Sequence, residues 1–329
     1  MELVLEGYNS NMLPGHAEPD ATSEYSGRFA NLRAAGFYRQ ADGLAVSSLG
    51  IGSYLGALDE KTDEAYTKAM AAAVHGGINF IDTSLNYRHQ RSELSIGKAI
   101  FELIAAGEVR RNEIAVCTKA GYLVPNATPV LNPADVVGRM HCLAPEFLND
   151  QLERSRINLG LETIDVFYLH NPETQLKAIA QDDFYSRIQA AFEILERKVS
   201  EGRIRFYGAA TWDGFRKADG LSLPRMAEIA RAVGGPEHRF RFIQMPINLA
   251  MREAMEGKPE TILDAAARLG ISVVSSASLL QARLAQTPPD AKRALQFSLS
   301  VPGVTVALVG MSNAAHVKEN LAIIGGPER

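Results

Sequence analysis

Four residues of the sequence have side chains suited to acid–base chemistry, and they lie at or just beyond the ends of three apolar segments of strand length. Asp82 and Tyr87 belong to FIDTSLNY, Lys119 to CTKAGY and His170 to FYLHNPE. An ammonium beside a tyrosine favours the phenolate and lowers the tyrosine pKa from its usual value of about 10. Asp82 would keep Lys119 charged, and His170 would orient a substrate carbonyl by donating a hydrogen bond. The set predicts general acid catalysis at a carbonyl, which typically contributes on the order of 10² to 10⁴ in rate.

Each of these residues also has a purely structural explanation. Asp82 fits a turn cap, Tyr87 rim packing, Lys119 a solvated loop and His170 a hydrogen-bonded core histidine. Singly, those explanations are favoured. Together they are not, because packing alone would rarely assemble an Asp–Lys pair beside a phenol and an imidazole.

A proton donor aimed at a carbonyl needs a partner that attacks the carbon. The sequence has no G-x-S-x-G nucleophile elbow, and no closely spaced His, Cys or acidic residues predict a metal site. Hydride from a bound nicotinamide would complete the reaction.

These residues require a scaffold that brings several strand ends together, and the chain alternates accordingly. Apolar, strand-length segments lie near 48–55, 78–82, 113–118, 164–169, 204–209, 241–246, 271–276 and 303–309. Segments with helical periodicity follow them at 63–77, 91–107, 145–160, 183–202, 223–235, 259–270, 289–300 and 313–325. Several of these helical segments begin at Pro, Asp or Asn and end at Gly, as helix boundaries do.

Eight strand–helix pairs in about 280 residues, with no linker between them, predict a closed parallel (β/α)₈ TIM barrel. A hairpin around Asp42-Gly43 precedes the first pair and is expected to plug the bottom of the barrel. The alternative is an open doubly wound sheet, but GIGSYLG has one residue too many for its glycine fingerprint. We therefore expect a polar N-terminal extension over residues 1–35 and a single barrel domain over 36–329.

Composition narrows the class of protein. The chain has 329 residues, 46% of them hydrophobic, with a net charge of −4 and a pI near 6.0, so neither nucleic acid nor an anionic membrane is expected as a partner. The sequence shows no signal peptide and no apolar run of about 18 residues, which predicts a cytoplasmic protein. Its two cysteines agree with a reducing compartment, and Cys117 is predicted to be buried in a strand. The oligomeric state stays open.

From about residue 38 to 325, the sequence resembles the aldo-keto reductase superfamily, in its bacterial type. INFIDTSLNY is similar to the first signature of the family, KAGY carries its lysine and YLHNPE its histidine. The resemblance implies a barrel that binds a nicotinamide cofactor across the strand ends and reduces carbonyls reversibly, without metal or flavin. Tyr87 would be the general acid in reduction and the base in oxidation, supported by Asp82, Lys119 and His170.

The resemblance also nominates cofactor contacts. They lie in segments that are similar to cofactor-binding segments of the family, at the C-terminal ends of several strands. The nominated residues are Gly52, Ser53, Tyr54, Asp82, Thr211, Gln244, Ser278, Leu279, Gln281, Gly310, Met311, Ser312, His316, Glu319 and Asn320.

Three positions depart from the family pattern. Ala210 and Thr211 replace a Ser-Asn pair that commonly meets the carboxamide, and Ser276 stands where an aromatic ring often stacks on the nicotinamide. His316 aligns with a basic residue that often meets the 2′-phosphate, and a histidine is mostly neutral at pH 7. NADPH is the expected cofactor, with NADH as the alternative.

Substrate contacts are expected in the long segment that follows Lys119. NPADVVGRMHC, residues 132–142, is interpreted as a short helix that walls the pocket. Tyr122 and His141 are the candidate contacts there, although surface exposure is also open for His141.

Two further candidates lie elsewhere. His89, with Arg88 and Arg91, either contacts a polar substrate or forms a solvated turn, and Trp212 either rims the pocket or packs under a loop. The substrate itself, a small carbonyl compound or alcohol, and the physiological direction are not specified by the sequence.

Two rival functions stay open. A Schiff-base aldolase would use Lys119 as its nucleophile but needs that lysine neutral, which Asp82 opposes. A nicotinamide-binding sensor or scaffold with low turnover is allowed by similarity to channel-associated members of the superfamily.

Overall fold

The structure, a computed structural model, describes residues 12–217, 219–257 and 259–324. Parts of three predictions lie outside these ranges: the first eleven residues of the N-terminal extension, the last five of the barrel domain, and Gly325 at the end of the last helix.

Eight parallel strands close into a barrel in the order β10-β11-β12-β3-β4-β5-β8-β9. The strands are β3 (Leu49–Gly52), β4 (Phe80–Asp82), β5 (Ala115–Ala120), β8 (Ile164–His170), β9 (Ile204–Ala210), β10 (Phe240–Pro246), β11 (Ser272–Ser276) and β12 (Val304–Gly310). Each overlaps a strand-length segment predicted above, so the predicted (β/α)₈ fold is confirmed. Cys117 is fully buried in β5, as expected.

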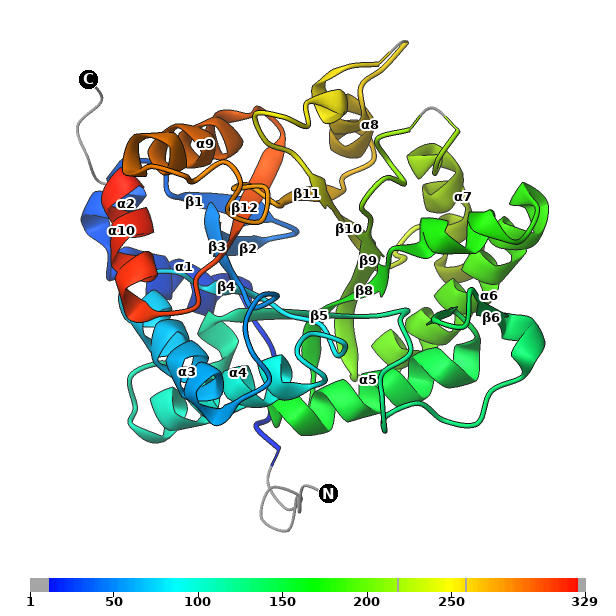
Figure 1. Cartoon of the computed structure of the whole chain (residues 1–329), viewed down its shortest axis with the longest axis horizontal. Helices are drawn as coiled ribbons and strands as arrows, with labels where there is room; N and C mark the ends of the chain where they lie inside the picture. The colour runs from blue at the N-terminus through cyan, green and yellow to red at the C-terminus, as the bar shows by residue number, and fades with distance from the viewer. Residues whose placement is uncertain (1–11, 218, 258, 325–329) are drawn as a thin grey trace.

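A helix follows each barrel strand, and Figure 1 shows these helices ringed around the strands. They are α3 (Glu60–His75), α4 (Arg91–Ala105), α5 (Pro145–Leu159), α6 (Gln181–Ser200), α7 (Leu223–Gly234), α8 (Ile262–Arg268), α9 (Pro288–Ser300) and α10 (Ala314–Ile324). Short 3₁₀ helices are η1 (Arg111–Glu113), η2 (Pro133–Asp135), η3 (Pro172–Lys177) and η4 (Glu253–Met255).

Local sequence explains several helix boundaries. The Asp59 side chain accepts a hydrogen bond from the Thr62 amide and caps the start of α3. Helix α5 begins at Pro145 and ends before Gly160, whose φ of 66° suits a residue without a Cβ.

The predicted hairpin is present. Strands β1 (Tyr38–Ala41) and β2 (Leu44–Ser47) pair antiparallel, and the two turn residues Asp42 and Gly43 have φ of 47° and 86°. Leu44 and Val46 belong to the same buried cluster as barrel residues near the strand starts, such as Phe80 and Ala115. The hairpin therefore fills the end of the barrel opposite the strand C-termini.

Two short helices, α1 (Pro19–Gly27) and α2 (Ala30–Ala34), precede the hairpin within the segment predicted to be a polar extension. The Tyr25 hydroxyl donates to the backbone oxygen of Val74 at 2.5 Å, and the Ala17 amide donates to Asp165 at 2.6 Å. These buried contacts tie the described part of the extension to the barrel.

The interpretation of residues 132–142 as a helix is wrong. After η2 the chain forms a small antiparallel pair, β6 (Val136–Val137) and β7 (His141–Cys142). Three residues, 138–140, connect the paired residues Val137 and His141, and the first two of them, Gly138 and Arg139, have left-handed φ of 59° and 58°. Two β-branched valines before that turn suit a strand better than a helix.

Among the described residues, no helix combines the length and the apolar character needed to cross a membrane.

Candidate active site

The four predicted acid–base residues come together at the C-terminal end of the barrel. Asp82 ends β4, Lys119 lies near the end of β5, His170 ends β8, and Tyr87 lies on the loop between β4 and α4. The Tyr87 ring is 5.8 Å from the His170 ring and 4.8 Å from the Lys119 ammonium. Active sites of such barrels lie at this end because loops from several strands converge there.

Lys119 forms a buried ion pair with Asp82. Its Nζ lies 2.6 Å from Asp82 Oδ2 and donates a second 2.6 Å hydrogen bond to the Thr83 backbone oxygen. Asp82 Oδ1 accepts from Gln244 at 2.9 Å. Burial alone lowers the pKa of Lys119, but Asp82 and Tyr87 outweigh it and raise that pKa above its usual value. Lys119 is therefore an ammonium at neutral pH.

The expectation of a lowered tyrosine pKa is wrong for this structure. Burial raises the pKa of the Tyr87 phenol, Lys119 lowers it, and the Asp82 charge raises it again, with a net increase. A buried phenolate loses hydration that one nearby ammonium does not replace. Tyr87 is consequently protonated at neutral pH, which suits a proton donor.

His170 is neutral and buried beneath the mouth of the site. Burial, the Lys119 charge and the neighbouring His141 hold its pKa well below the usual range. Its Nδ1 lies 3.1 Å from the hydroxyl of Ser84. A neutral imidazole carries one N–H, so the nitrogen that faces the substrate depends on what the other nitrogen does.

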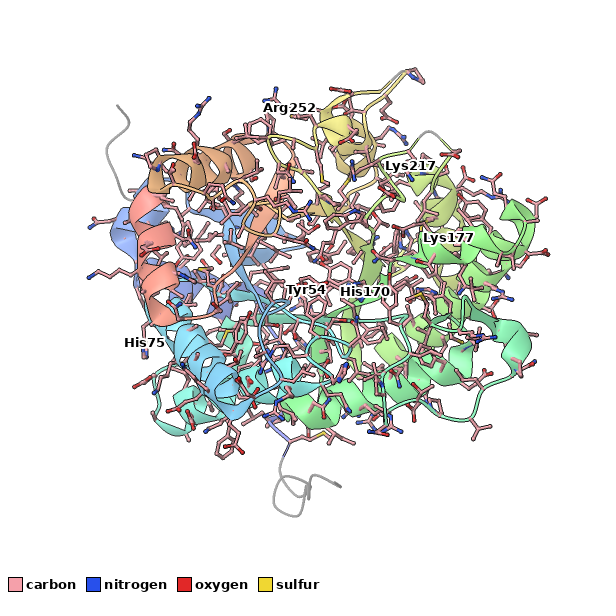
Figure 2. The ribbon with its side chains drawn as sticks, viewed as in Figure 1. Tyr54, His75, His170, Lys177, Lys217 and Arg252 are labelled. Carbon is pink, nitrogen blue, oxygen red and sulfur yellow. The ribbon has the colours of Figure 1, made fainter. Side chains whose placement is uncertain are left out.

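A cavity of about 500 Å³ opens above these residues. Figure 2 shows Tyr54 and His170 near one another over the centre of the barrel, and both line this cavity. The predicted site residues that line it are Gly52, Ser53, Tyr54, Asp82, Tyr87, Tyr122, His170, Thr211, Trp212, Gln244, Ser278, Leu279, Gln281 and Gly310. Trp212 thus rims the pocket, one of the two alternatives stated for it.

Lys119 and the other predicted site residues lie outside this lining. Lys119 is completely buried and contacts Asp82 and the ring of Tyr87. The others are His89, His141, Met311, Ser312, His316, Glu319 and Asn320.

The substrate role expected for His89 is not supported, because its side chain is exposed and outside the cavity. Its neighbours are engaged elsewhere: Arg88 and Arg91 both form ion pairs with Asp63 of α3, with Arg88 at 2.6 Å. The segment is the turn that precedes α4, as the second alternative stated, but it is solvated only in part, because Arg88 is buried.

His141 is fully buried, so the surface-exposed alternative is wrong, and it supports His170 instead of reaching the cavity. Its Nε2 lies 2.8 Å from the His170 backbone oxygen, and its Nδ1 lies 2.8 Å from Gln175 Nε2. Arg187 in turn donates to Gln175 Oε1 at 2.5 Å. Since arginine only donates and a backbone oxygen only accepts, the direction of every bond in this chain is fixed. Burial lowers the pKa of His141 to about 4.

The residues nominated beyond β12 do not share one environment. Met311 is fully buried, Asn320 is buried in α10, Ser312 is half-buried, and His316 and Glu319 are exposed. The cavity reaches β12 only as far as Gly310.

Three polar residues at the site were not predicted. Asn86 and Asn171 line the cavity, and Asn171 donates to the Tyr122 hydroxyl at 2.9 Å. Glu173 Oε1 accepts from three consecutive amides, those of residues 212, 213 and 214, and so fixes the backbone of Trp212. All three stand in FIDTSLNY or FYLHNPE, so their position at strand ends was the available signal.

The cavity also has features that fit an anionic, extended cofactor. Ser278 Oγ lines it, is buried and has no hydrogen-bond partner in the described structure. The backbone nearby is strained, with positive φ at Ala277, Leu280, Gln281 and Ala282. Non-glycine residues adopt this conformation at a cost of about 1–3 kcal/mol each and cluster at ligand sites. The set offers an unsatisfied hydroxyl where a phosphate oxygen is expected.

The departures from the family pattern are visible in the cavity wall. The Thr211 amide donates to the Gln244 backbone oxygen, and Ser276 lines the cavity without an aromatic ring. The Gln244 side-chain amide is already bound to Asp82. An aromatic ring in the cavity wall comes from Tyr54, whose ring centre lies 4.9 Å from that of Tyr87.

Within the described residues, no group of three or more His, Cys, Asp or Glu side chains is placed to hold a metal ion.

A model of the Aldo/keto reductase family matches residues 48–293, about three quarters of the chain. The chain belongs to this family. Gly310 and the nominated residues that follow it lie outside the matched range.

Two curated relatives and one solved structure show the range of similarity. An NADH-specific methylglyoxal reductase from Escherichia coli K12 is 28% identical over 137 residues, 42% of this chain and 38% of that protein. A putative voltage-gated potassium channel subunit beta from Schizosaccharomyces pombe is 31% identical over 178 residues, 53% of this chain and 44% of that protein. An aldo/keto reductase from Klebsiella pneumoniae, solved with NADP and acetate, superposes with a TM-score of 0.62 at 19% identity, covering 88% of this chain and 89% of that one. The matched region thus spans less than half of each curated relative.

Proposed function

We propose that this aldo/keto reductase reversibly reduces an aldehyde or ketone to an alcohol with a nicotinamide cofactor, and that Tyr87 is the general acid. The observation that carries the proposal is geometric: the Tyr87 ring lies 4.8 Å from the ammonium of the buried Lys119–Asp82 pair and 5.8 Å from the His170 ring, and Tyr87 and His170 line one cavity. This arrangement can hold a carbonyl oxygen between two polar groups and protonate it.

The cofactor, when bound, supplies the hydride. Tyr87 would give its proton to the carbonyl oxygen, and the positive charge of Lys119 would stabilise the phenolate that remains. Asp82 keeps Lys119 charged and in place. In oxidation Tyr87 would take the proton back, so the same residues serve both directions.

NADPH is the proposed cofactor, with NADH as the alternative. The Klebsiella structure contains NADP, whereas the Escherichia relative is NADH-specific. Ser278 and the strained segment beside it would receive the pyrophosphate, and His316 is the candidate for the 2′-phosphate. His316 is exposed and cannot form the forked contact that an arginine makes with a phosphate, so it gives weak discrimination between the two cofactors.

The substrate is proposed to be a small, uncharged carbonyl compound. The part of the cavity wall that is nominated neither for catalysis nor for the cofactor includes five larger side chains, those of Asn86, Tyr122, Met140, Asn171 and Trp212. These side chains offer amide and hydroxyl groups and aromatic surface but no net charge. A substrate carboxylate or phosphate would find no partner among them.

The test is turnover of an activated aryl aldehyde with NADPH and with NADH, in wild type and in Tyr87→Phe. We expect Tyr87→Phe to lose on the order of 10² to 10⁴ in kcat while still binding cofactor, measured by fluorescence titration. Tyr168→Phe is the matched control, because this tyrosine is buried two residues from His170 and its hydroxyl has no partner in the described structure.

Other outcomes separate the alternatives. Cofactor binding without turnover across a carbonyl panel would favour the sensor function, to which the similarity with a channel subunit points. Borohydride trapping of substrate on Lys119 would favour the aldolase. The Lys119 Nζ is buried and donates to Asp82 and to the Thr83 backbone oxygen, which argues against an attack of this nitrogen on a substrate carbonyl.

A further inference from the structure

Ser84 stands at a branch point of hydrogen bonds next to the candidate active site. Its side chain is fully buried, and its Oγ lies 2.6 Å from Asn86 Oδ1, 3.1 Å from the Lys119 backbone oxygen and 3.1 Å from His170 Nδ1. A serine hydroxyl has one proton, so it can donate to only one of these three neighbours.

The destination of that proton decides which nitrogen of His170 carries hydrogen. If Ser84 donates to Nδ1, the neutral ring carries its hydrogen on Nε2. If Ser84 donates elsewhere, it can accept from Nδ1–H, and Nε2 is left with a bare lone pair. Nε2 has no partner among the described residues, and His170 lines the cavity, so Nε2 is the nitrogen available to substrate. Only Nε2–H attracts a carbonyl oxygen.

Asn86 controls the competition for this proton. Its side chain has no other hydrogen bond in the described structure, so its amide is free to present either end to Ser84. Its oxygen accepts the hydroxyl proton and diverts it from His170. Its nitrogen instead donates to Ser84 Oγ. The proton then goes to His170 Nδ1 or to the Lys119 backbone oxygen, which also accepts from the Leu85 amide.

We propose that Ser84 is a positioning residue that sets the tautomer of His170, and that the Asn86 amide selects this tautomer by donating to Ser84 in the competent state. The proposal rests on the proposed function, because it assigns a role in carbonyl binding. The three side chains neither gain nor lose a proton in total. When the tautomer changes, His170 releases its Nδ1 proton and takes up a proton from solvent at Nε2, while the Asn86 amide and the Ser84 hydroxyl turn.

Asn86→Asp is the sharpest test, because a carboxylate of nearly the same shape accepts but does not donate. At pH 8 it should capture the Ser84 proton and force hydrogen onto His170 Nδ1. We expect kcat to fall on the order of 10²-fold, as for removal of one donor to a developing oxyanion. The added charge alone would also perturb the site, so a second variant is required.

The double variant Asn86→Asp with Ser84→Ala separates the two effects. Without the serine hydroxyl, the carboxylate cannot act on His170 through a hydrogen bond, while its charge remains. We expect the double variant to recover at least about tenfold in kcat over Asn86→Asp alone. Ser298→Ala, which removes a buried serine hydroxyl in α9, controls for loss of a buried serine in general.

The readout that does not depend on turnover is the ¹⁵N spectrum of histidine-labelled protein, in which protonated and bare ring nitrogens resonate far apart. His170→Gln identifies the His170 signals. We expect hydrogen on Nε2 in wild type and in the double variant, and on Nδ1 in Asn86→Asp. An unchanged tautomer in Asn86→Asp, or equal kcat in the single and double variants, would overturn the proposal. Full activity in Tyr87→Phe would instead overturn the proposed function and leave this spectrum informative.

Discussion

Replacing Lys119 with methionine should expose how much the fold depends on the buried ion pair at the active site. The Lys119 ammonium is 0% exposed and the Asp82 carboxylate 5%, and their nearest atoms are 2.6 Å apart. At an effective dielectric constant of about 20, that separation corresponds to an attraction of about 6 kcal/mol. Much of this attraction only offsets the cost of removing the two charges from water. Removal of Lys119, however, leaves the Asp82 carboxylate buried without a charged partner.

Such a loss typically costs about 3–5 kcal/mol. A matched control is Lys198→Met, because Lys198 is also 2.7 Å from its carboxylate partner, Glu201, but that partner is 40% exposed. Exposed ion pairs contribute about 0–1 kcal/mol. Urea unfolding at pH 7 should therefore give a loss of about 3–5 kcal/mol for Lys119→Met and less than about 1 kcal/mol for Lys198→Met, with unchanged m values.

The loss of stability in Lys119→Met should also depend on pH. Burial already raises the pKa of Asp82 in the folded protein although the Lys119 ammonium lowers it, so loss of this ammonium raises that pKa further. A raised pKa means that the folded state prefers the protonated carboxyl. The penalty is therefore full at neutral pH and is lost as the pH falls toward 4.

The double variant Lys119→Met with Asp82→Asn removes both charges and keeps an amide near Gln244. Its loss of stability should be smaller than the sum of the two single losses by about 2 kcal/mol or more. Additive losses, or a Lys119→Met cost below about 1 kcal/mol that does not change with pH, would refute the account of a buried charge held by its partner.

Three further outcomes follow from the site. Because the pKa of Tyr87 is raised, the kcat/KM of reduction should be flat through neutral pH and fall only in alkali, while that of oxidation should rise with pH; a decline of reduction between pH 6 and 8 would contradict this. Glu173→Gln weakens the acceptor for three amides around Trp212, so steady-state kinetics should show a several-fold higher KM with a smaller change in kcat, whereas a loss confined to kcat would argue against a role in the pocket wall. Because His141 is buried in its neutral form, with a pKa of about 4, the free energy of unfolding of wild type should fall by about 2 kcal/mol more between pH 7 and pH 5 than that of His141→Gln, measured by urea unfolding. An identical pH dependence of stability in both proteins would contradict the neutral burial of His141.

Sequence patterns located the scaffold because each barrel element repeats the same local signals. Buried strands are continuous apolar runs, and helix boundaries are marked by residues such as Pro145 and Gly160, so the alternation follows from local chemistry. Placement of Asp82 and His170 at one rim then follows from the fold alone, since parallel strands in a barrel end on the same side.

What the sequence missed depends on environment. A lysine near Tyr87 predicts a lowered pKa, but the sign reverses once burial of both groups is included. The segment 132–142 has a helical composition in part, yet a left-handed turn at Gly138 and Arg139 converts it into a hairpin. Neither effect is encoded in the spacing of the residues concerned.

The two buried histidines at the site show why some roles can be assigned from contacts and others need an experiment. His141 stands in a chain that starts at Arg187, which only donates, and ends at a backbone oxygen, which only accepts, so its tautomer is determined. His170 is linked to Ser84 and Asn86, and each of these can donate or accept. The backbone of His170 is therefore held by hydrogen bonds whose direction is fixed. Its ring is contacted at Nδ1, opposite the nitrogen that faces substrate, by groups whose hydrogen bonds can run in either direction. One set of residues thus fixes the His170 backbone, and another sets which ring nitrogen carries hydrogen. Substitution of Asn86 should change the tautomer of His170 without disturbing the hydrogen bond from His141 to the His170 backbone oxygen.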